Sequence, residues 1–225
     1  YLINDNELYV IEVNPRASRT IPYISKVTGV EMVDIATKVM TGTPLKDIGY
    51  GTGLYKQPPY VAAKVPVFSF EKLSDVNSAL GPEMKSTGEV LGVGRTKEEA
   101  LFKGMVSAGF KVGSRPGNKR GSVLMSVRDQ DKDEIVKLAK KLEDIGLKIY
   151  ATRGTATEVA RMGIDVTPIN KLYQDNSMME LLESGELEYI IFTGAGERSS
   201  ISDYTMLHRR ALQLSVPCIT SIDTA

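Results

Sequence analysis

From Ser122 to the end of the chain, short apolar runs alternate with amphipathic stretches, and this alternation limits the possible folds. The runs SVLMSV, LKIYAT, IDVTPIN, LEYIIFTG and VPCITS have the composition of β-strands. The stretches between them, such as KDEIVKLAKKLEDIG and DYTMLHRRALQLS, place their apolar side chains on one side of a helix. Because parallel strands are joined by crossover helices, the pattern predicts a doubly wound, mostly parallel α/β domain.

Polar residues stand at the predicted strand–helix junctions of this domain. The carboxyl ends of parallel strands meet at one edge of the sheet, where ligands of such domains bind. Hydroxyls and backbone amides at a helix N-terminus favour an anion, and lysines add positive charge. Taken alone, each residue also fits a helix cap or a solvated strand end. The candidate anion-binding residues are Ser126, Lys132, Thr152, Gly154, Thr155, Lys171 and Thr193.

The N-terminal half opens with two β-rich runs, YLIN and LYVIEVN, and the DNE between them predicts a hairpin. Side chains alternate between the faces of a strand, so Glu12 and Asn14 share a face and lie about 6–7 Å apart. That spacing lets both oxygens reach one Mg²⁺ ion or a pair of them. A proline then ends the strand, and Arg16 and Arg19 enter a turn where their guanidinium groups suit phosphate oxygens. The alternative is an edge strand whose Glu12 and Asn14 merely face solvent.

Further along, EMVDIATKVMTG predicts a helix whose apolar stripe is expected in the core, and PYVAAKVPVFSF predicts an extended segment. Gly92 and Gly94 form a G-x-G pair without the third glycine of a dinucleotide-binding loop, which favours a tight turn. Thr96 is the expected N-cap of the next helix, with Glu99 three residues on. The apolar stripe consists of Met32, Ile35, Ala36 and Val39.

Composition narrows the class of protein. Lys and Arg together number 28, as do Asp and Glu, so nothing indicates a general attraction to nucleic acid or membranes. No apolar run approaches the ~20 residues that span a bilayer. The single cysteine, Cys218, excludes an internal disulfide and favours a reducing, cytoplasmic location. The stretch VGSRPGNKRGS predicts a linker at residues 113–121, between a first domain at 1–112 and a second at 122–225.

The segment EVNPRASRTIPYISKVTG closely resembles the metal-binding segment of the second ATP-grasp unit in the large subunit of carbamoyl phosphate synthetases. The resemblance continues through VMTGTPL, AAKVPVFSFEKL and LGPEMKSTGEVLGVGRTKEEAL and covers essentially the whole chain. It implies that Glu12 and Asn14 bind Mg²⁺ or Mn²⁺. It also implies that Arg16 and Arg19 contact the phosphate transferred from ATP. A further family ligand, a glutamine, is expected just before Tyr1, so the chain is expected to be the C-terminal piece of a longer polypeptide.

The same resemblance implies an activity. Family members are ATP-dependent ligases that phosphorylate carbamate for pyrimidine and arginine biosynthesis. The implied partners are a glutaminase small subunit, which supplies ammonia from glutamine, and the N-terminal part of the large subunit. The 225 residues alone are expected to be inactive.

The second half resembles the methylglyoxal-synthase-like domain that ends this large subunit and serves as its allosteric module. The resemblance implies that UMP or IMP is bound by the residues matching Lys132, Thr152, Thr155 and Lys171. At the fourth junction this chain has Phe192 where family members often carry Asn. This difference leaves the identity of the effector open.

Two alternatives accompany this interpretation. One is a stand-alone methylglyoxal synthase, whose catalytic aspartate would be Asp175 in KLYQDNSMM. That family needs paired glycines beside the aspartate, and their absence here makes Asp175 a surface residue or a helix cap instead. The other alternative is a pure nucleotide-binding module, which nucleotide would stabilise without being consumed.

Overall fold

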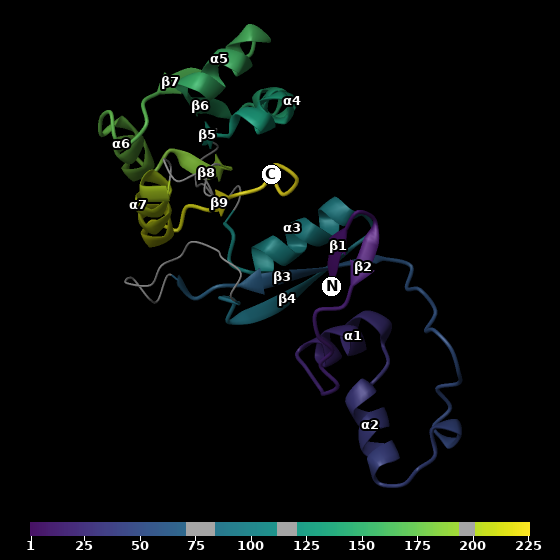
Figure 1. The fold of residues 1–225 in the computed structure, drawn as a ribbon. Helices are drawn as coiled ribbons and strands as arrows, with labels where there is room; N and C mark the ends of the chain where they lie inside the picture. Colours follow the sequence, from purple (N-terminus) through teal and green to yellow (C-terminus); the bar gives the residue numbers. More distant parts are fainter. Residues whose placement is uncertain (71–83, 112–120, 194–200) are drawn as a thin grey trace. The chain divides into compact units, whose positions relative to one another are not determined.

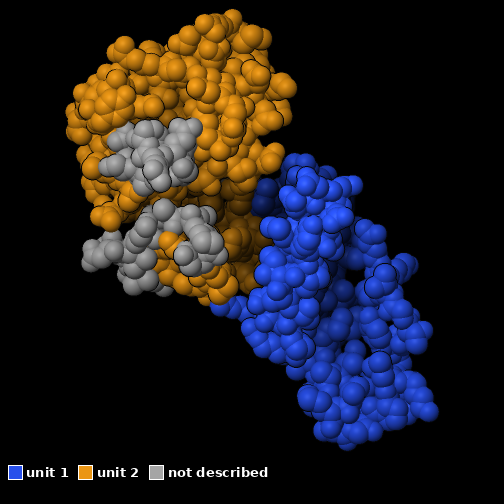
Figure 2. Space-filling view, viewed as in Figure 1, with its two compact units in different colours: residues 1–63, 91–103 blue, residues 64–90, 104–225 orange. Residues whose placement is uncertain are grey.

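The structure, a computed structural model, describes residues 1–70, 84–111, 121–193 and 201–225. It divides into two compact units, residues 1–63 with 91–103 and residues 64–90 with 104–225 (Figure 2). Apart from Gly121, the predicted linker lies outside the described residues, so the domain limits at 112 and 122 stay a prediction. The division into units runs through strands β3 (Val61–Val67) and β4 (Gly88–Gly94) and helix α3 (Lys97–Ser107).

A short hairpin opens the first unit. Strands β1 (Leu2–Asn4) and β2 (Glu7–Tyr9) pair in antiparallel orientation. The two turn residues, Asp5 and Asn6, have φ angles of 49° and 65°, which is the left-handed conformation of a two-residue type I′ turn. The predicted hairpin is therefore confirmed.

The second strand of this hairpin is shorter than predicted. β2 ends at Tyr9, which pairs with Leu2, the first residue of β1. Residues 10–19 form neither a strand nor a helix. The prediction of a strand running through Asn14 was wrong, because a ladder extends only as far as its partner and β1 offers three residues. Glu12 and Asn14 consequently lie in an unpaired segment.

Two nine-residue helices follow, α1 (Thr20–Thr28) and α2 (Met32–Met40), and they contact one another. α1 ends at Gly29, whose φ of 72° suits glycine and whose N–H donates to the carbonyl of Ser25. No side chain of either helix is buried. The expectation that the stripe on α2 belongs to a core was wrong for the described residues, because one short neighbouring helix covers only part of it. A 3₁₀ turn, η1 (Leu45–Asp47), comes next.

Strands β3 and β4 form a two-stranded sheet, and α3 follows β4. The predicted capping interaction is present at the start of α3, where the N–H of Glu99 donates to Oγ1 of Thr96 at 3.2 Å. In return, the Glu99 carboxylate accepts a hydrogen bond from the N–H of Arg95 at 2.7 Å. The predicted N-cap is therefore confirmed.

The G-x-G pair lies inside β4 rather than in the predicted tight turn. A Cβ built at Gly94 would stand 2.6 Å from the backbone nitrogen of Ala100. Glycine at this position therefore lets the first turn of α3 approach the end of the strand closely.

The second unit contains a five-stranded, fully parallel sheet in the order β7-β6-β5-β8-β9 (Figure 1). This confirms the predicted doubly wound α/β domain. The chain moves outward from β5 through β6 to β7, and then returns to place β8 and β9 on the other side of β5. The strand order therefore reverses between β5 and β8. The strands are β5 (Ser122–Ser126), β6 (Lys148–Thr152), β7 (Thr167–Ile169), β8 (Leu187–Phe192) and β9 (Cys218–Ile219).

Two pairs of helices cover the two faces of this sheet (Figure 1). α4 and α5 contribute Ile135 and Val159 to one buried cluster, while α6 and α7 contribute Leu182 and Leu207 to another. β5 is buried along its whole length because its alternate side chains serve both clusters. In the described part of the chain, no helix is both long and apolar enough to cross a membrane. The helices are α4 (Lys132–Asp144), preceded by the 3₁₀ turn η3 (Asp129–Asp131), α5 (Arg153–Arg161), α6 (Ser177–Glu183) and α7 (Ile201–Gln213).

Candidate functional site

Three buried hydroxyl groups gather at the carboxyl edge of the parallel sheet. Ser126 ends β5, Thr152 ends β6, and Thr155 lies in the first turn of α5. Thr152 Oγ1 lies 3.3 Å from Ser126 Oγ and 3.4 Å from Thr155 Oγ1. Thr155 Oγ1 also accepts a hydrogen bond from the N–H of Val127 at 3.4 Å. The structure therefore brings these three predicted residues together.

The N-terminus of α5 adjoins this cluster. Thr152 is the N-cap residue, with φ of −60° and ψ of 147°, and no side chain caps the helix. Uncapped N–H groups at the start of a helix are suited to an anion. Gly154 adds no side chain there, and a Cβ at this position would stand 3.5 Å from Nζ of Lys132. The ammonium of Lys132 therefore lies close to the first turn of α5.

Lys132 pairs with a carboxylate that the sequence analysis missed. Lys132 Nζ forms an ion pair with Asp129 Oδ1 at 2.7 Å. The hydrogen bond from Lys132 lowers the pKa of the Asp129 carboxyl, and the charge of Lys171 acts in the same direction. The Asp129 side chain itself is 96% exposed, so this ion pair lies at the surface. The three-residue spacing of Asp129 and Lys132 was the sequence signal for this contact.

Thr193 follows β8 and faces β5 where the strand order reverses. Its N–H donates to the carbonyl of Ser126 at 3.2 Å, and its Oγ1 accepts from the N–H of Arg128 at 3.1 Å. Arg128 pairs with Asp131 at 2.9 Å. Hydrogen bonds from Arg128 and then from Thr193 lower the pKa of the Asp131 carboxyl. Thr193 therefore holds the loop after β5 in place, and its hydroxyl is already hydrogen-bonded within that loop.

Phe192 packs into the core instead of contributing to the rim. It is 6% exposed and belongs to the cluster between the sheet and α6 and α7. Its ring centroid lies 5.2 Å from that of Tyr204, which in turn stacks on His208 at 5.1 Å. The last side chain of β8 is thus used for packing and offers no hydrogen-bonding group to the rim.

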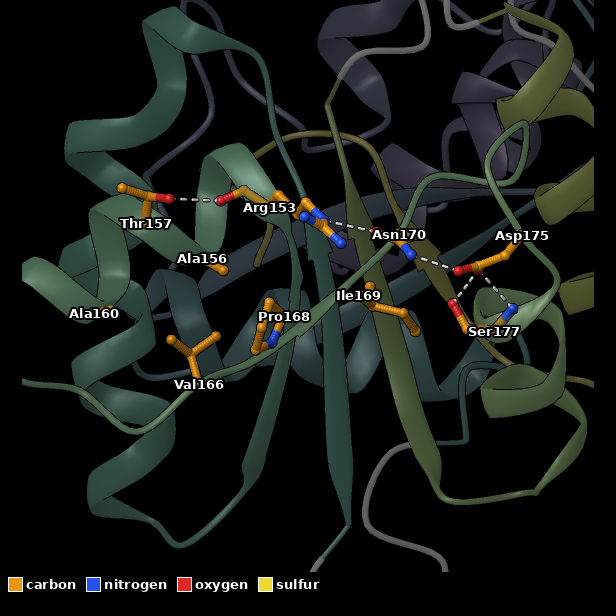
Figure 3. A pocket seen from close by; sticks show the side chains of 10 residues that line it. All are labelled: Arg153, Ala156, Thr157, Ala160, Val166, Pro168, Ile169, Asn170, Asp175 and Ser177. Carbon is orange, nitrogen blue, oxygen red and sulfur yellow. Dashed lines mark hydrogen bonds between the residues drawn. The ribbon is translucent and has the colours of Figure 1, made fainter.

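A cavity of about 650 Å³ lies beside α5 and the edge strand β7 (Figure 3). A chain of hydrogen bonds crosses one end of it. Arg153 Nε donates to Asn170 Oδ1 at 2.7 Å, and Asn170 Nδ2 donates to Asp175 Oδ2. Asp175 Oδ1 accepts from the N–H of Ser177 at 3.0 Å and from its hydroxyl. The other lining residues are Ala156, Thr157, Ala160, Val166, Pro168 and Ile169.

Asp175 is the residue on which the methylglyoxal synthase alternative depends. It is exposed, which agrees with the prediction of a surface residue, and its carboxylate accepts from the N–H of Ser177, the first residue of α6, whose N-cap is Asn176. Hydrogen bonds from Asn170 and then from Ser177 lower the pKa of the carboxyl, so it stays ionised. The sequence analysis missed both Asn170 and Arg153, because the contact between them exists only once β7 and α5 are in place.

The four candidate residues of the first unit are all exposed. Asn14 Nδ2 donates to Glu12 Oε1 at 3.1 Å, so the two predicted metal ligands are adjacent. The guanidinium of Arg16 donates to the carbonyl of Ala17 at 3.2 Å, and Arg19 occupies the N-cap position of α1. Arg16 contacts the pair through its backbone, because its N–H donates to the carbonyl of Asn14 at 2.8 Å. Among the described hydrogen bonds, none joins either guanidinium to the side chain of Glu12 or Asn14.

Glu12 and Asn14 fit a hard cation in their chemistry, because both carry the oxygen donors that Mg²⁺ and Mn²⁺ prefer. Flipping the side-chain amide of Asn14 exchanges its oxygen and nitrogen, so that the oxygen faces Glu12 and both side chains present oxygen. Among the described residues, no group of three or more His, Cys, Asp or Glu side chains could hold a metal. Glu12 and Asn14 therefore fit as two of the ligands of a metal site.

Comparison with known proteins matches both halves of the chain. The family profile named MGS-like domain matches residues 134–220, and the profile named Carbamoyl-phosphate synthase L chain, ATP binding domain, matches residues 1–48. A carbamoyl phosphate synthase large chain from Clostridium perfringens is 47% identical over 98% of this chain and 20% of its own length. One from Clostridium botulinum is 47% identical over 96% of this chain and 20% of its own length.

One solved structure is also similar. The crystal structure of methylglyoxal synthase from Elizabethkingia anophelis NUHP1 aligns with 47% of this chain and 74% of that chain. The TM-score is 0.37 and the identity 16%.

The two family matches follow the predicted order along the chain, with the ATP-binding match first and the MGS-like match over the parallel sheet. The chain spans about one fifth of the length of the curated relatives it matches. Those relatives align with nearly every one of its residues. The chain therefore belongs to the carbamoyl phosphate synthase large-chain family.

Proposed function

We propose that this chain serves a carbamoyl phosphate synthase in two ways. Its parallel-sheet domain binds a nucleoside monophosphate of the UMP or IMP class as an allosteric effector. Its N-terminal segment contributes ligands to the site that phosphorylates carbamate. The observation that carries the first role is the convergence of buried hydroxyls, an uncapped helix N-terminus and Lys132 at one edge of the sheet.

The chemistry of this edge suits a phosphate monoester. The N-terminus of α5 carries partial positive charge and unpaired N–H groups, which favour a doubly charged phosphate. The hydroxyls of Thr152 and Thr155 are placed to donate to phosphate oxygens at the same helix start. Lys132 and Lys171 would add two positive charges, and a phosphate would take the place of the exposed Asp129 carboxylate beside Lys132. This is the arrangement expected for a site that recognises the phosphate group first.

The second role rests on the ATP-binding match over residues 1–48. Glu12 and Asn14 would hold Mg²⁺ or Mn²⁺, which would neutralise charge on the phosphates of ATP. Arg16 and Arg19 would stabilise the transferring phosphoryl group through their guanidinium groups. The remainder of the large chain and a glutaminase small subunit, which supplies ammonia, are the proposed partners. We place this enzyme in the cytoplasm, in pyrimidine and arginine biosynthesis, and expect the 225 residues alone to show no carbamate-dependent ATPase activity.

Calorimetric titration of the 225-residue chain with UMP, IMP and phosphoribosyl pyrophosphate tests the first role. One of the three should bind, and the double variant Thr152→Ala/Lys171→Ala should lower its affinity by about 100-fold or more, because two hydrogen bonds to a charged phosphate are lost. Lys140→Ala is the matched control, since Lys140 is an exposed lysine of α4 paired with Glu143 and Asp144.

Two results would count against this role. Equal binding by the wild type and the double variant would place the nucleotide elsewhere. An absence of heat and of thermal stabilisation with all three ligands would mean that this edge of the sheet does not sense these nucleotides.

A further inference from the structure

We propose that Asn170 is the positioning residue of the effector site, fixing the loop that carries Lys171 against the N-terminus of α5. The inference rests on the proposed effector site and adds to it a residue that touches no ligand. Asn170 follows β7 directly and precedes Lys171 in the chain. Its role would be exerted through the backbone that the two residues share.

The amide of Asn170 joins two structural elements of the site. On one side it accepts from Nε of Arg153, at 2.7 Å. Arg153 is the first residue of α5 and lies between Thr152 and Gly154, two residues of the candidate anion site. The contact therefore ties the loop after β7 to the helix start that would receive the phosphate.

On its other side, Asn170 donates from Nδ2 to Asp175, whose carboxylate accepts from the N–H of Ser177 at the start of α6 (Figure 3). The intervening loop is closed by Gln174, whose side chain accepts from the N–H of Lys171 at 3.2 Å. The backbone N–H of Gln174 donates to the carbonyl of Lys171 at 2.9 Å. Lys171 thus sits in a turn that is held at both ends, by Asn170 and by Asp175.

The direction of the hydrogen bonds explains why an amide stands at this position. A side chain between Arg153 and Asp175 must accept from a guanidinium and donate to a carboxylate. Asparagine does both, whereas aspartate only accepts. The polar groups at this end of the cavity are therefore paired with one another, which favours a brace between two loops over a separate ligand site.

Because these hydrogen bonds have a fixed direction, exchanging the residue types at positions 170 and 175 tests the proposal. Asn170→Asp keeps the acceptor for Arg153 but sets two carboxylates against each other. Asp175→Asn alone leaves at least one donor facing another donor, whichever way the two amides turn. The double variant Asn170→Asp/Asp175→Asn restores every bond, because the new residue 175 donates to the new residue 170 and still accepts from Ser177. It also keeps the net charge of the wild type.

Affinities for UMP and inorganic phosphate would be measured by calorimetry, and hydrogen exchange of residues 170–176 would be measured without ligand. We expect each single variant to bind about five- to tenfold more weakly and to exchange faster, as for the loss of a buried or charge-assisted hydrogen bond. The double variant should return to within about twofold of the wild type in both measurements, because the paired changes are strongly coupled. Glu158→Gln, which removes the partner of Arg161 farther along α5, is the matched control.

If Asp175 acted through its negative charge alone, the affinities and exchange rates of the variants would differ from those expected above. Removing the negative charge of Asp175 near Lys171 would then tighten phosphate binding, and the double variant would not recover the exchange behaviour of the wild type. Either result would overturn the positioning role, as would unchanged exchange in the single variants. If the wild type binds neither UMP nor phosphate while the exchange pattern holds, the effector proposal fails and the brace stands.

Discussion

Asp129 is the residue whose charge most directly opposes anion binding at the effector site. Its carboxylate pairs with Lys132 at 2.7 Å in the absence of a phosphate. Asp129→Asn should therefore tighten the binding of UMP and inorganic phosphate, by up to about fivefold, which is the range of an exposed ion pair. Calorimetric titration measures the change. Asp144→Asn is the matched control, because Asp144 is the exposed partner of Lys140 on the same helix.

Weaker binding by Asp129→Asn would contradict this expectation. It would mean that the ion pair holds the ammonium of Lys132 in its binding position, instead of competing with the ligand.

Cys218 gives a second prediction at the scale of one residue. Burial raises the pKa of its thiol to about 12, so almost none of it is thiolate near neutral pH. Because the thiolate is the reactive form, we expect the native chain to react with Ellman's reagent much more slowly than the unfolded chain at about pH 8. One thiol per chain should react in concentrated guanidinium chloride. Rapid labelling of the native chain would show that β9 opens readily.

The residues predicted for the effector site came from their positions at strand ends, which sequence patterns indicate well. Thr152, Thr155 and Lys132 do gather at one edge of the sheet. Asp129 was missed although its three-residue spacing from Lys132 is a local signal for the ion pair. Asn170 was missed for a physical reason, because its contacts with Arg153 and Asp175 depend on side-chain pairing between loops, which no local pattern encodes.

At the scale of elements, the approach of α3 to β4 depends on Gly94. A Cβ there would stand 2.6 Å from the nitrogen of Ala100, a backbone atom that cannot turn aside. Gly94→Ala should therefore lower the free energy of unfolding by about 1–3 kcal/mol, as measured by urea denaturation. Gly88→Ala on the same strand is the control, because its Cβ would meet Val67 at an ordinary 3.8 Å. Equal effects of the two variants would contradict the close-approach argument.

A substitution at Gly154 should change ligand binding without lowering the stability of helix α5. Its Cβ would meet only Nζ of Lys132, at 3.5 Å, and alanine is the better helix former. Gly154→Ala should therefore leave the melting temperature unchanged or slightly raised, while it narrows the space beside Lys132 and weakens UMP binding. Thermal unfolding and calorimetry together check this. A loss of both stability and affinity would indicate that the glycine serves the backbone of α5 instead.

Element lengths were predicted well for the three inner strands of the parallel sheet, and poorly for its edge strands β7 and β9, which are shorter than their apolar runs, and for the N-terminus. An inner strand has a partner on both sides. β2, in contrast, depends on how many residues β1 offers for pairing, which its own sequence does not specify. The stripe on α2 shows the same limit, because an apolar pattern indicates a face to be covered but not what covers it.

At the scale of the whole molecule, the parallel-sheet domain contains both of its buried clusters almost entirely within residues 122–225. We expect this segment, expressed alone, to unfold in one cooperative thermal transition followed by circular dichroism. Met105 is a partly buried residue packed against one cluster, and losing it should cost no more than about 1–2 kcal/mol. A broad, non-cooperative transition would show that the domain needs residues before 122.

The central position of β5 has a consequence for synthesis on the ribosome. β5 is the first strand of its sheet to be made, yet its partner β8 ends at Phe192, which pairs with Ser126. Until that partner emerges, one edge of a fully buried strand has nothing to pair with, and such edges recruit other chains. Nascent chains that stall between β7 and β8 should therefore be the ones that chaperones hold, while chains that have released β8 can close the sheet.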